Sequence, residues 1–255
     1  MTADVWTRAI PLPLKRFAAR YLERRGYVRS AGATNIHGVM SRRPEVPVES
    51  VIDIGASDGR WSAELMRHFP GASYLLVEAQ EAAHGEALRQ FKAAHRNVDY
   101  VLAAAGDRDG EVHFDASDPF GGVASPAPFP RNDIVVRMAA VDTLVRERSV
   151  RPPFLLKLDT HGFEAPILEG ARETLRQSSM LVIEAYNFTL RPGCLRFYEL
   201  CQFLEARGFR CVDLFDILHR PGDHAFWQMD MVFVPLSHPA FQSNEYALGS
   251  IGVCP

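Results

Sequence analysis

Short apolar runs alternate with stretches of helical periodicity through most of this chain. Five of the runs have the length of buried strands, and they lie at residues 51–54, 73–77, 98–103, 154–159 and 180–184. Stretches with apolar side chains at helical spacing lie between them, at residues 58–69, 81–95 and 164–177. Regular alternation of strands and helices favours parallel strands that are joined by right-handed crossovers.

Further elements complete this pattern toward the C-terminus. A helix is predicted over residues 195–207, and two closing strands are predicted over residues 209–215 and 229–234. Residues 111–115 and 134–141 also have extended patterns. The seven main strands predict a Rossmann-like, doubly wound α/β fold, in which a mostly parallel seven-stranded sheet has helices on both faces.

The N-terminal segment differs from the rest of the chain in charge. Residues 1–43 hold nine Lys or Arg and two acidic residues, a net charge of +7, whereas the whole chain carries −3. Residues 14–25 place apolar side chains on one face of a predicted helix and basic ones on the other, and Gly26 is a suitable end. Such a helix could form a lid or touch an anionic surface, but we favour simple packing across the domain.

Two segments have irregular sequences. Residues 29–49 contain Gly, Pro and Arg and predict a linker to the first strand. We therefore divide the chain into an N-terminal helical extension, residues 1–45, and a main domain, residues 46–255. Residues 116–133 hold six Gly or Pro, and a loop of this length in a compact domain is usually functional or disordered. We expect a lid over a binding site there, with a surface excursion as the alternative.

The overall composition says more about where the protein is expected to be found than about what it does. A hydrophobic content of 47%, a charged content of 23% and a net charge of −3 are ordinary values, and they create no general attraction for nucleic acid. No apolar run approaches the roughly 20 residues of a membrane span, and basic residues interrupt the start of the chain. The four cysteines show no metal-binding spacing. We expect reduced thiols and a cytoplasmic location.

The first candidate ligand-binding segment is the turn after the first strand, Asp53-Ile54-Gly55-Ala56-Ser57-Asp58-Gly59. Glycines at 55 and 59 allow the backbone to pass close to a ligand. The turn lacks the GxGxxG pattern, and the acids at 53 and 58 would repel a pyrophosphate. S-adenosylmethionine, which carries an ammonium and a sulfonium group, suits such a turn better.

Glu78 supports the same interpretation. It ends the second strand roughly 20 residues after the turn, where an acid commonly binds ribose hydroxyls. Ala104 follows the third strand, at a position that often faces adenine. A glycine-rich turn with capping acids is the alternative explanation. The candidate cofactor-binding residues are Asp53, Gly55, Ala56, Ser57, Asp58, Gly59, Trp61, Glu78, Ala79, Ala104 and Asp159.

A second polar group follows the fourth strand. Asp159 ends that strand, His161 lies two residues on and Glu164 opens the next helix. From here the chain resembles the FkbM-type methyltransferases, a branch of the class I S-adenosylmethionine-dependent enzymes, over about residues 48–235. The resemblance rests on Val51–Gly59, Val141–Leu144, Leu156–Glu164, Ile167–Ala171 and Leu181–Glu184.

One position departs from the family pattern. The pattern is similar to K-I-D-x-E-G-x-E-x-x-x-L-x-G-A, which begins here at Lys157, and His161 stands where the family usually has Glu. The resemblance implies a class I methyltransferase fold and S-adenosylmethionine as methyl donor. It also implies O-methylation of a hydroxyl on a small molecule, such as a sugar, a glycan or a specialised metabolite.

An alcohol is a weak nucleophile near neutral pH and needs a base or a metal ion. His161 is the best candidate base because imidazole titrates near neutral pH, and Asp159 and Lys157 complete the candidate catalytic set. A histidine that only caps the next helix is the alternative.

A metal ion is the second route to activation. Asp159, Glu184 and Asn187 would together offer oxygen ligands to Mg²⁺. Trp227 could wall the acceptor pocket or serve as an aromatic anchor in the core. The candidate substrate-contacting residues are His161, Glu184, Asn187, Trp227 and Asp230.

Two other function classes remain open. One is a non-catalytic protein that keeps the S-adenosylmethionine-binding fold. The other is a nucleotide-cofactor oxidoreductase on the same sheet, which the lack of GxGxxG and of a Tyr-x-x-x-Lys pair disfavours. For partners we expect a small-molecule hydroxyl acceptor, no nucleic acid and, on base rates, a homodimer. The sequence does not specify the acceptor.

Overall fold

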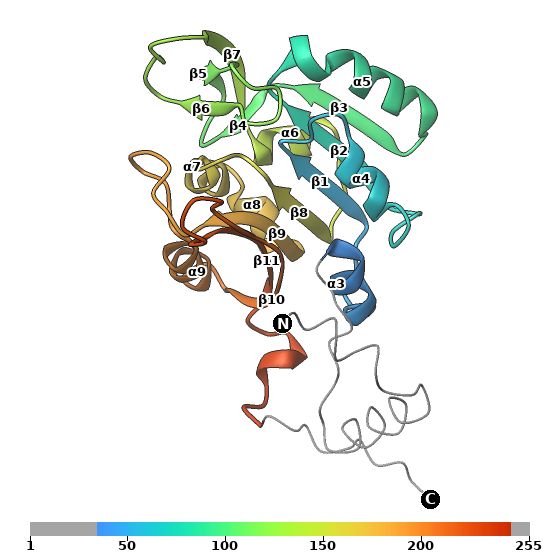
Figure 1. Ribbon diagram of the computed structural model, residues 1–255. Helices are drawn as coiled ribbons and strands as arrows, with labels where there is room; N and C mark the ends of the chain where they lie inside the picture. The colour runs from blue at the N-terminus through green and yellow to red at the C-terminus, as the bar shows by residue number, and fades with distance from the viewer. Residues whose placement is uncertain (1–34, 246–255) are drawn as a thin grey trace, which may run out of the picture. The chain divides into compact units, whose positions relative to one another are not determined.

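The computed structural model describes residues 35–245 (Figure 1). A compact unit spans residues 34–236 and contains both sheets found in the described residues. Residues 237–245 fall outside that unit and include the short 3-10 helix η1 (Pro239–Phe241). The basic helix predicted over residues 14–25 lies outside the described residues.

A seven-stranded sheet forms the centre of the compact unit, as predicted. Its strand order is β3-β2-β1-β8-β9-β11-β10, and all neighbouring strands are parallel except where β11 runs antiparallel to β9 and β10. The order reverses between β1 and β8, which is where doubly wound sheets bind ligands. The strands are β1 (Ser50–Ile54), β2 (Ser73–Glu78), β3 (Val98–Leu102), β8 (Phe154–Leu158), β9 (Ser178–Tyr186), β10 (Phe209–His219) and β11 (Phe226–Pro235).

Helices cover both faces of this sheet, which confirms the predicted Rossmann-like architecture. Figure 1 shows α3, α4 and α5 on one face and α7, α8 and α9 on the other, with α6 leading into β8. The helices are α3 (Ile36–Arg42), α4 (Arg60–Leu65), α5 (Glu81–Ala94), α6 (Val141–Glu147), α7 (Glu164–Glu169), α8 (Arg172–Arg176) and α9 (Phe197–Glu205).

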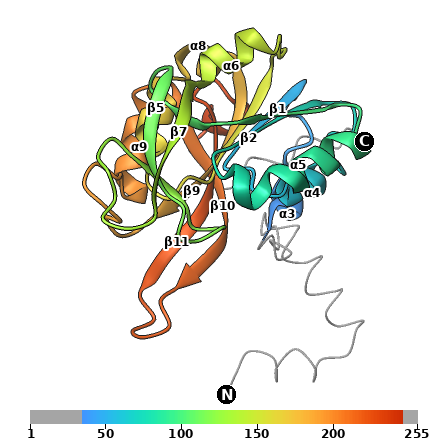
Figure 2. The same ribbon diagram turned by 90° about the horizontal axis from the view of Figure 1, so that it is seen from above.

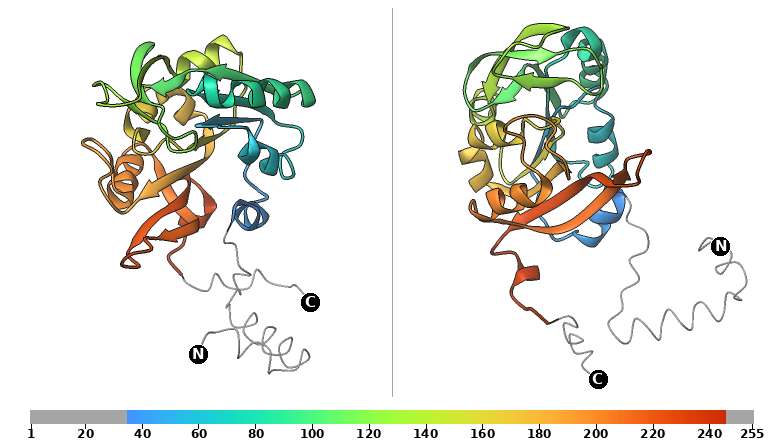
Figure 3. Two further views of the ribbon diagram at one scale, coloured as in Figure 1. Left: turned by 45° about the horizontal axis from the view of Figure 1, so that its top comes forward. Right: turned by 60° about the vertical axis from the view of Figure 1, so that its left-hand side comes forward.

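A second, four-stranded sheet lies beside the carboxyl ends of the main strands, drawn in green in Figures 1 and 3. Its order is β4-β7-β5-β6, and β5 pairs antiparallel with both neighbours. The extended patterns at 111–115 and 134–141 are confirmed as β5 and β7. The strands are β4 (Ala104–Gly106), β5 (Gly110–Asp115), β6 (Val123–Ser125) and β7 (Asp133–Ala140).

Burial explains why the central strands have continuous apolar sequences. Every residue of β1 and β8 is buried, because helices cover both faces of a parallel sheet. Only two charged side chains interrupt these two strands, and they pair with each other: Asp53 of β1 lies directly opposite Lys157 of β8. The sheet register therefore places a buried ion pair just before the strand ends.

Two helices occupy the segment where one was predicted, residues 164–177. The break falls at Gly170, where an added Cβ would overlap a carbonyl oxygen of strand β4. The Asp142 carboxylate accepts hydrogen bonds from the amides of Glu173 and Thr174 at 2.9 and 2.8 Å, which caps the new helix α8. The single-helix prediction is wrong because this close approach and this cap were not visible in the periodicity.

The predicted linker over residues 29–49 contains a helix. Asn35 caps α3 by accepting a hydrogen bond from the amide of Gly38 at 3.2 Å. At the other end of α3, the Arg42 guanidinium lies 2.6 Å from the Asp213 carboxylate of β10. The linker prediction is therefore wrong for this segment, since α3 is fastened to the main sheet.

The hairpin of β10 and β11 extends beyond the rest of the sheet, as Figure 2 shows in orange and red. Both strands are longer than predicted, and Ile217 and Leu218 near the tip of β10 are exposed. None of the helices between residues 35 and 245 is long and apolar enough to cross a membrane.

Candidate functional site

A cavity of about 450 Å³ opens at the carboxyl ends of β1, β2, β8 and β9. We call the part formed by the turn after β1 and by Glu78 the β1–β2 end. The part formed by Asp159, His161 and Glu184 is the β8–β9 end. The predicted site residues that line the cavity are Gly55, Ala56, Ser57, Trp61, Glu78, Ala79, Ala104, Lys157, Asp159, His161 and Glu184.

Gly55 holds the turn after β1 against the end of β8. Its φ is +74°, a conformation that favours glycine, and an added Cβ would overlap the carbonyl oxygen of Asp159. The amides of Gly55 and Ala56 both donate to the carbonyl oxygen of Val77, at 3.0 and 3.2 Å. The turn is therefore fixed from both sides by backbone groups of neighbouring strands.

Glu78 is buried at the end of β2 and shapes the same turn. One carboxylate oxygen accepts a hydrogen bond from the amide of Ser57, and the other accepts from the amide of Gln80, each at 2.8 Å. Ser57 has a φ of +52°, so the Glu78 contact stabilises a left-handed residue in the turn. Each oxygen keeps a further lone pair for a ligand in the cavity.

Lys157 lies beneath the cavity and joins its two ends. The Nζ atom lies 3.1 Å from Oδ1 of Asp53 and 3.4 Å from Oδ2 of Asp159, and it donates to the carbonyl oxygen of Gly55 at 3.2 Å. Burial acts to lower the pKa of Lys157, but the Asp53 and Asp159 carboxylates outweigh it and raise the pKa above its ordinary value. The two carboxylates therefore favour the charged ammonium form of Lys157.

Three predicted cofactor residues do not line the cavity. Asp53 is fully buried, and its second oxygen accepts a hydrogen bond from Ser62 at 2.7 Å. Asp58 pairs with Arg60 at 2.7 Å, and Gly59 ends the turn at a φ of +84°. Both carboxylates are paired with cations that line the cavity, Asp53 with Lys157 and Asp58 with Arg60, so the repulsion of phosphate that we expected from them is offset.

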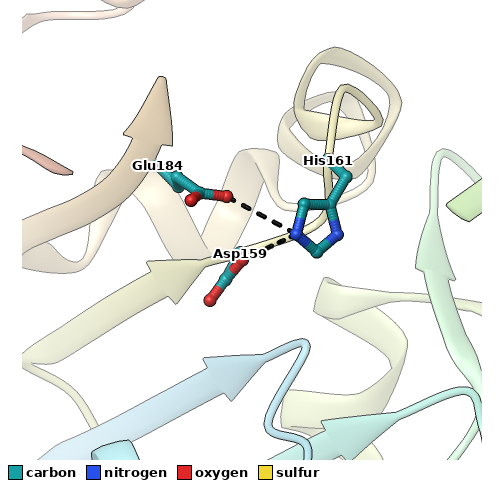
Figure 4. Close-up of side chains that lie close together, drawn as sticks. All are labelled: Asp159, His161 and Glu184. Carbon is teal, nitrogen blue, oxygen red and sulfur yellow. Dashed lines mark ion pairs between the residues drawn. The ribbon is translucent and has the colours of Figure 1, made fainter. Parts of the chain in front are cut away.

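The β8–β9 end brings one imidazole and two carboxyl groups together (Figure 4). Nε2 of His161 lies 3.6 Å from Oδ1 of Asp159 and 3.7 Å from Oε2 of Glu184. Nδ1 of His161 lies 3.3 Å from the carbonyl oxygen of Gly122, in the small sheet's loop. His161 has a φ of +51°, which is uncommon for a residue other than glycine and which aims the ring at both carboxyls.

The two carboxyl groups at this end differ in their pKa. Burial and the adjacent Asp159 carboxylate raise the pKa of Glu184 to about 9. Burial also acts on Asp159, but the Lys157 and His161 side chains outweigh it and lower the Asp159 pKa. Glu184 accepts a hydrogen bond from the Tyr186 hydroxyl at 2.6 Å and another from the Gln228 amide.

Asn187 and Trp227 lie outside the lining of this cavity. The Asn187 amide donates to the carbonyl oxygen of Phe226 at 3.1 Å, which ties it to β11. The Trp227 ring stacks on Phe188, with 5.2 Å between centroids. Trp227 is half-buried on Phe188, so both interpretations of this residue stay predictions, and the Asn187 amide is directed to β11.

Asp230 also lies behind the cavity wall. It faces Glu184 across the antiparallel pairing of β9 and β11. Burial and the Asp159 carboxylate raise its pKa to about 7. The sequence therefore predicted the strand ends that meet here, but it did not separate the residues that reach the cavity from those behind them.

The predicted lid contributes one wall of the cavity. The Gln80 amide donates to the carbonyl oxygens of Pro119 and of the preceding residue, both at 3.0 Å, and Nε2 of His84 lies 2.7 Å from the Pro119 oxygen. Phe120, which is 58% exposed, lies under the Arg60 guanidinium. Part of the 116–133 segment is thus anchored over the β1–β2 end.

Sequence reasoning missed the apolar wall. Phe114 of β5, Phe163 at the N-cap of α7 and Ile167 within α7 line the cavity. The alternation of buried Val112 and Phe114 in β5 was a usable signal, because it predicts one face turned inward. Phe163 and Ile167 gave no such signal, since their positions depend on how α7 packs under the small sheet.

A second cavity adjoins the first. It has a volume of about 1020 Å³ and shares Ala124 and Phe163 with the first cavity. The loop around Phe129 and the segment around Arg191 form its walls, and the Arg191 guanidinium lies 5.7 Å from the Phe129 ring centre.

A family model for the methyltransferase FkbM domain matches residues 53–211 of this chain. A search of curated protein sequences finds no significant match.

Among solved structures, an FkbM methyltransferase from Methylobacillus flagellatus has 17% identity and a TM-score of 0.46, over 72% of this chain and 43% of that one. A Streptococcus pneumoniae protein, described as a candidate tRNA (m1A22) methyltransferase, has 16% identity and a TM-score of 0.47, over 78% and 68%. TrmK of M. capricolum in complex with S-adenosylhomocysteine has 9% identity and a TM-score of 0.45, over 77% and 67%.

This chain thus spans less than half the length of the first of these proteins. The expectation that the chain has no nucleic-acid partner gains no support from these comparisons and stays a prediction.

Proposed function

This chain belongs to the FkbM methyltransferase family, and from that premise we propose that it transfers a methyl group from S-adenosylmethionine to a hydroxyl oxygen of a small molecule. The acceptor class is a sugar, a glycan or another specialised metabolite. In such a transfer the acceptor oxygen attacks the methyl carbon, the carbon–sulfur bond breaks with its electron pair going to sulfur, and S-adenosylhomocysteine leaves. The hydroxyl proton passes to a base or to water.

One observation carries the proposal. A single cavity joins a glycine-hinged turn and a buried acid at one end to an imidazole with two carboxyls at the other. Displacement at carbon needs donor and acceptor held in line, and a cavity with two chemically different ends can align them. Its volume of about 450 Å³ is within the usual range for a small-molecule site.

We place the donor at the β1–β2 end. The Gly55–Ser57 turn has no side chain that blocks approach at Gly55, and the free lone pairs of Glu78 are suited to ribose hydroxyls. Ala79 and Ala104 line the wall on either side, where small side chains leave room for adenine. The Nζ atom of Lys157 lies 5.5 Å from the centre of the Trp61 ring, which forms part of the cavity wall at this end.

We place the acceptor hydroxyl at the β8–β9 end. Nε2 of His161 faces the cavity between the two carboxyls and can take the hydroxyl proton when no ion is bound there. Lys157 keeps Asp159 ionised, so that this carboxylate can hold the resulting imidazolium. The rest of the acceptor can extend past Phe163 into the larger second cavity.

Calorimetric titration with S-adenosylhomocysteine tests the donor assignment. We expect binding heat with S-adenosylhomocysteine and none with NADH. Glu78→Gln should weaken S-adenosylhomocysteine at least about 10-fold, because glutamine keeps only one acceptor oxygen and its NH2 group would face the amide of Ser57 or Gln80. Glu86→Gln, an exposed change on α5, is the matched control and should leave the affinity unchanged.

The acceptor assignment is tested by transfer of labelled methyl groups to a panel of glycosides, hydroxylated metabolites and tRNA. Labelled sugars or metabolites are the expected products. Labelled tRNA alone would contradict the small-molecule acceptor. Binding of NADH without S-adenosylhomocysteine would favour the oxidoreductase alternative, and S-adenosylhomocysteine binding without any transfer would favour the non-catalytic one. A cytoplasmic location and a homodimer remain parts of the proposal.

A further inference from the structure

We propose that Asp159, His161 and Glu184 form a binding site for one divalent transition-metal ion such as Mn²⁺ or Zn²⁺. The catalytic use of such an ion rests on the proposed function, whereas the affinity for the ion does not. This ligand set differs from the oxygen-rich Mg²⁺ site predicted from the sequence, because His161 takes the place of Asn187.

The orientation of the His161 ring supports the site. Nδ1 lies 3.3 Å from the carbonyl oxygen of Gly122, which can only accept a hydrogen bond, so the structure assigns the ring proton to Nδ1. The lone pair of Nε2 then points at the two carboxyl groups. Metal-binding histidines usually donate their second ring N–H to a carbonyl or carboxylate in this way.

The distances fit an ion between the three groups. Oδ1 of Asp159 and Oε2 of Glu184 lie 3.6 and 3.7 Å from Nε2, and all three ligand atoms lie within 4.8 Å of one another. Bonds of about 2.0–2.2 Å to a transition ion put neighbouring ligands roughly 3.0–3.4 Å apart. The two imidazole–carboxylate separations would shorten by a few tenths of an ångström around an ion, and the two carboxylate oxygens, which lie within 4.8 Å of each other, would move together by up to about 1.5 Å.

Neighbouring side chains hold the carboxyl groups from behind. The Tyr186 hydroxyl and the Gln228 amide both donate to Glu184, and Lys157 lies 3.4 Å from the outer oxygen of Asp159. Such supporting contacts orient ligands and leave their remaining lone pairs directed at the ion. The three facing atoms are all acceptors under this assignment, so a cation or a shared proton must lie between them.

The donor set indicates the kind of ion. Mg²⁺ and Ca²⁺ prefer oxygen ligands alone, whereas one imidazole nitrogen with two carboxylates suits Mn²⁺, Fe²⁺ or Zn²⁺. An ion on Nε2 uses the lone pair that proton transfer to His161 also needs. The ion would instead polarise the acceptor hydroxyl directly, so the two roles of His161 exclude each other.

Titration of the chelator-treated full chain with MnCl₂, without donor or acceptor, tests the proposal. Calorimetry should show one Mn²⁺ bound per chain, at least about 10-fold tighter than Mg²⁺. Pulsed EPR of bound Mn²⁺ should show coupling to an imidazole nitrogen. That coupling should disappear in His161→Asn, a variant chosen because asparagine tolerates the positive φ at this position.

Matched variants locate the ion. Asp159→Asn and Glu184→Gln should each weaken Mn²⁺ by more than about 100-fold, because each removes a charged ligand. Asp223→Asn in the β10–β11 hairpin and Glu86→Gln on α5 change exposed carboxylates in the same way and should leave Mn²⁺ affinity unchanged. Circular dichroism of each variant checks that it is folded.

No Mn²⁺ or Zn²⁺ binding by the folded chain would overturn the site and leave a shared proton between the three groups. Equal affinities for Mn²⁺ and Mg²⁺, or undiminished binding by Glu184→Gln, would overturn it as well. The titration contains no donor and no acceptor, so failure of the metal site and failure of the proposed function are separate outcomes.

Discussion

The two ends of the cavity are built in different ways. At the β1–β2 end, backbone groups hold the site residues in place. Gly55 packs against the carbonyl of Asp159, and Glu78 accepts hydrogen bonds from the amides of Ser57 and Gln80. At the β8–β9 end, side chains hold one another, as Tyr186 and Gln228 hold Glu184. One end therefore depends on the path of the backbone, and the other depends on contacts between side chains.

Lys157 touches both ends, so its removal should have the largest effect. Lys157→Met leaves the buried Asp53 carboxylate without its cation, and such a loss typically costs about 3–5 kcal/mol. We expect that loss in the free energy of unfolding, measured with urea. Lys92→Met, which breaks an exposed pair with Asp99, should cost less than about 1 kcal/mol. Equal losses in the two variants would contradict the structural role of Lys157.

The next largest effect should come from the β1–β2 end alone. Gly55→Ala places a Cβ against the Asp159 carbonyl at a φ of +74°, and we expect a loss of about 3 kcal/mol in unfolding free energy. S-adenosylhomocysteine binding should be lost as well. Gly71→Ala is the matched control, since nothing lies within 4 Å of its added Cβ. Full stability of Gly55→Ala would show that the turn can move away from β8.

A change at the β8–β9 end should lower turnover and leave the affinity for the methyl donor unchanged. His161→Asn should lower methyl transfer by about 10²-fold, roughly 2.7 kcal/mol, with S-adenosylhomocysteine affinity nearly intact. His224→Asn changes an exposed histidine that also has a positive φ, and it should leave turnover unchanged. If His161→Asn weakened S-adenosylhomocysteine binding as much as it slowed methyl transfer, the two ends of the cavity would not have separate roles.

The smallest effect concerns Glu164, which is buried beside the β8–β9 end. Burial raises its pKa, although its Oε1 accepts hydrogen bonds from Thr160 and from the amide of Gly162. A raised carboxyl pKa contributes stability below the ordinary value of about 4.5, and this contribution is lost as the pH rises through the raised pKa.

Glu164→Gln keeps an accepting oxygen and cannot ionise. Its Tm should therefore exceed that of the natural chain by about 2 °C at pH 8, with a smaller difference at pH 5. Glu86→Gln should show no such pH-dependent difference. A lower Tm for Glu164→Gln at pH 8 would mean that the charged form of Glu164 is the stabilising one.

The contrast between the two ends also explains what could be predicted from the sequence. The apolar runs gave all seven main strands, and the spacing of Gly55 and Glu78 gave the β1–β2 end, because both features are local. The sequence placed Asp159 and Glu184 at neighbouring strand ends for the same reason. It could not show that the Asn187 amide turns toward β11, since that depends on the pairing of β9 with β11.

The sequence did not show which charged side chains pair with each other. The predicted roles of Asp53 and Asp58 assumed unpaired acids, whereas Asp53 pairs with Lys157 and Asp58 with Arg60. Lys157 lies more than 100 residues from Asp53, and only the register of β1 against β8 brings them together. Charge at a site is therefore predictable from sequence only after the strand order is known.

The buried ammonium of Lys157 can link ligand binding at one end of the cavity to ligand binding at the other. A ligand that draws Asp159 toward itself would leave Asp53 and the Gly55 carbonyl as the remaining partners of the ammonium, which could then move closer to them. Thermodynamic coupling of this kind is reciprocal, so occupancy of the turn must change affinity at Asp159 by the same factor. Donor and acceptor would bind cooperatively through one charge, without any rearrangement of the strands.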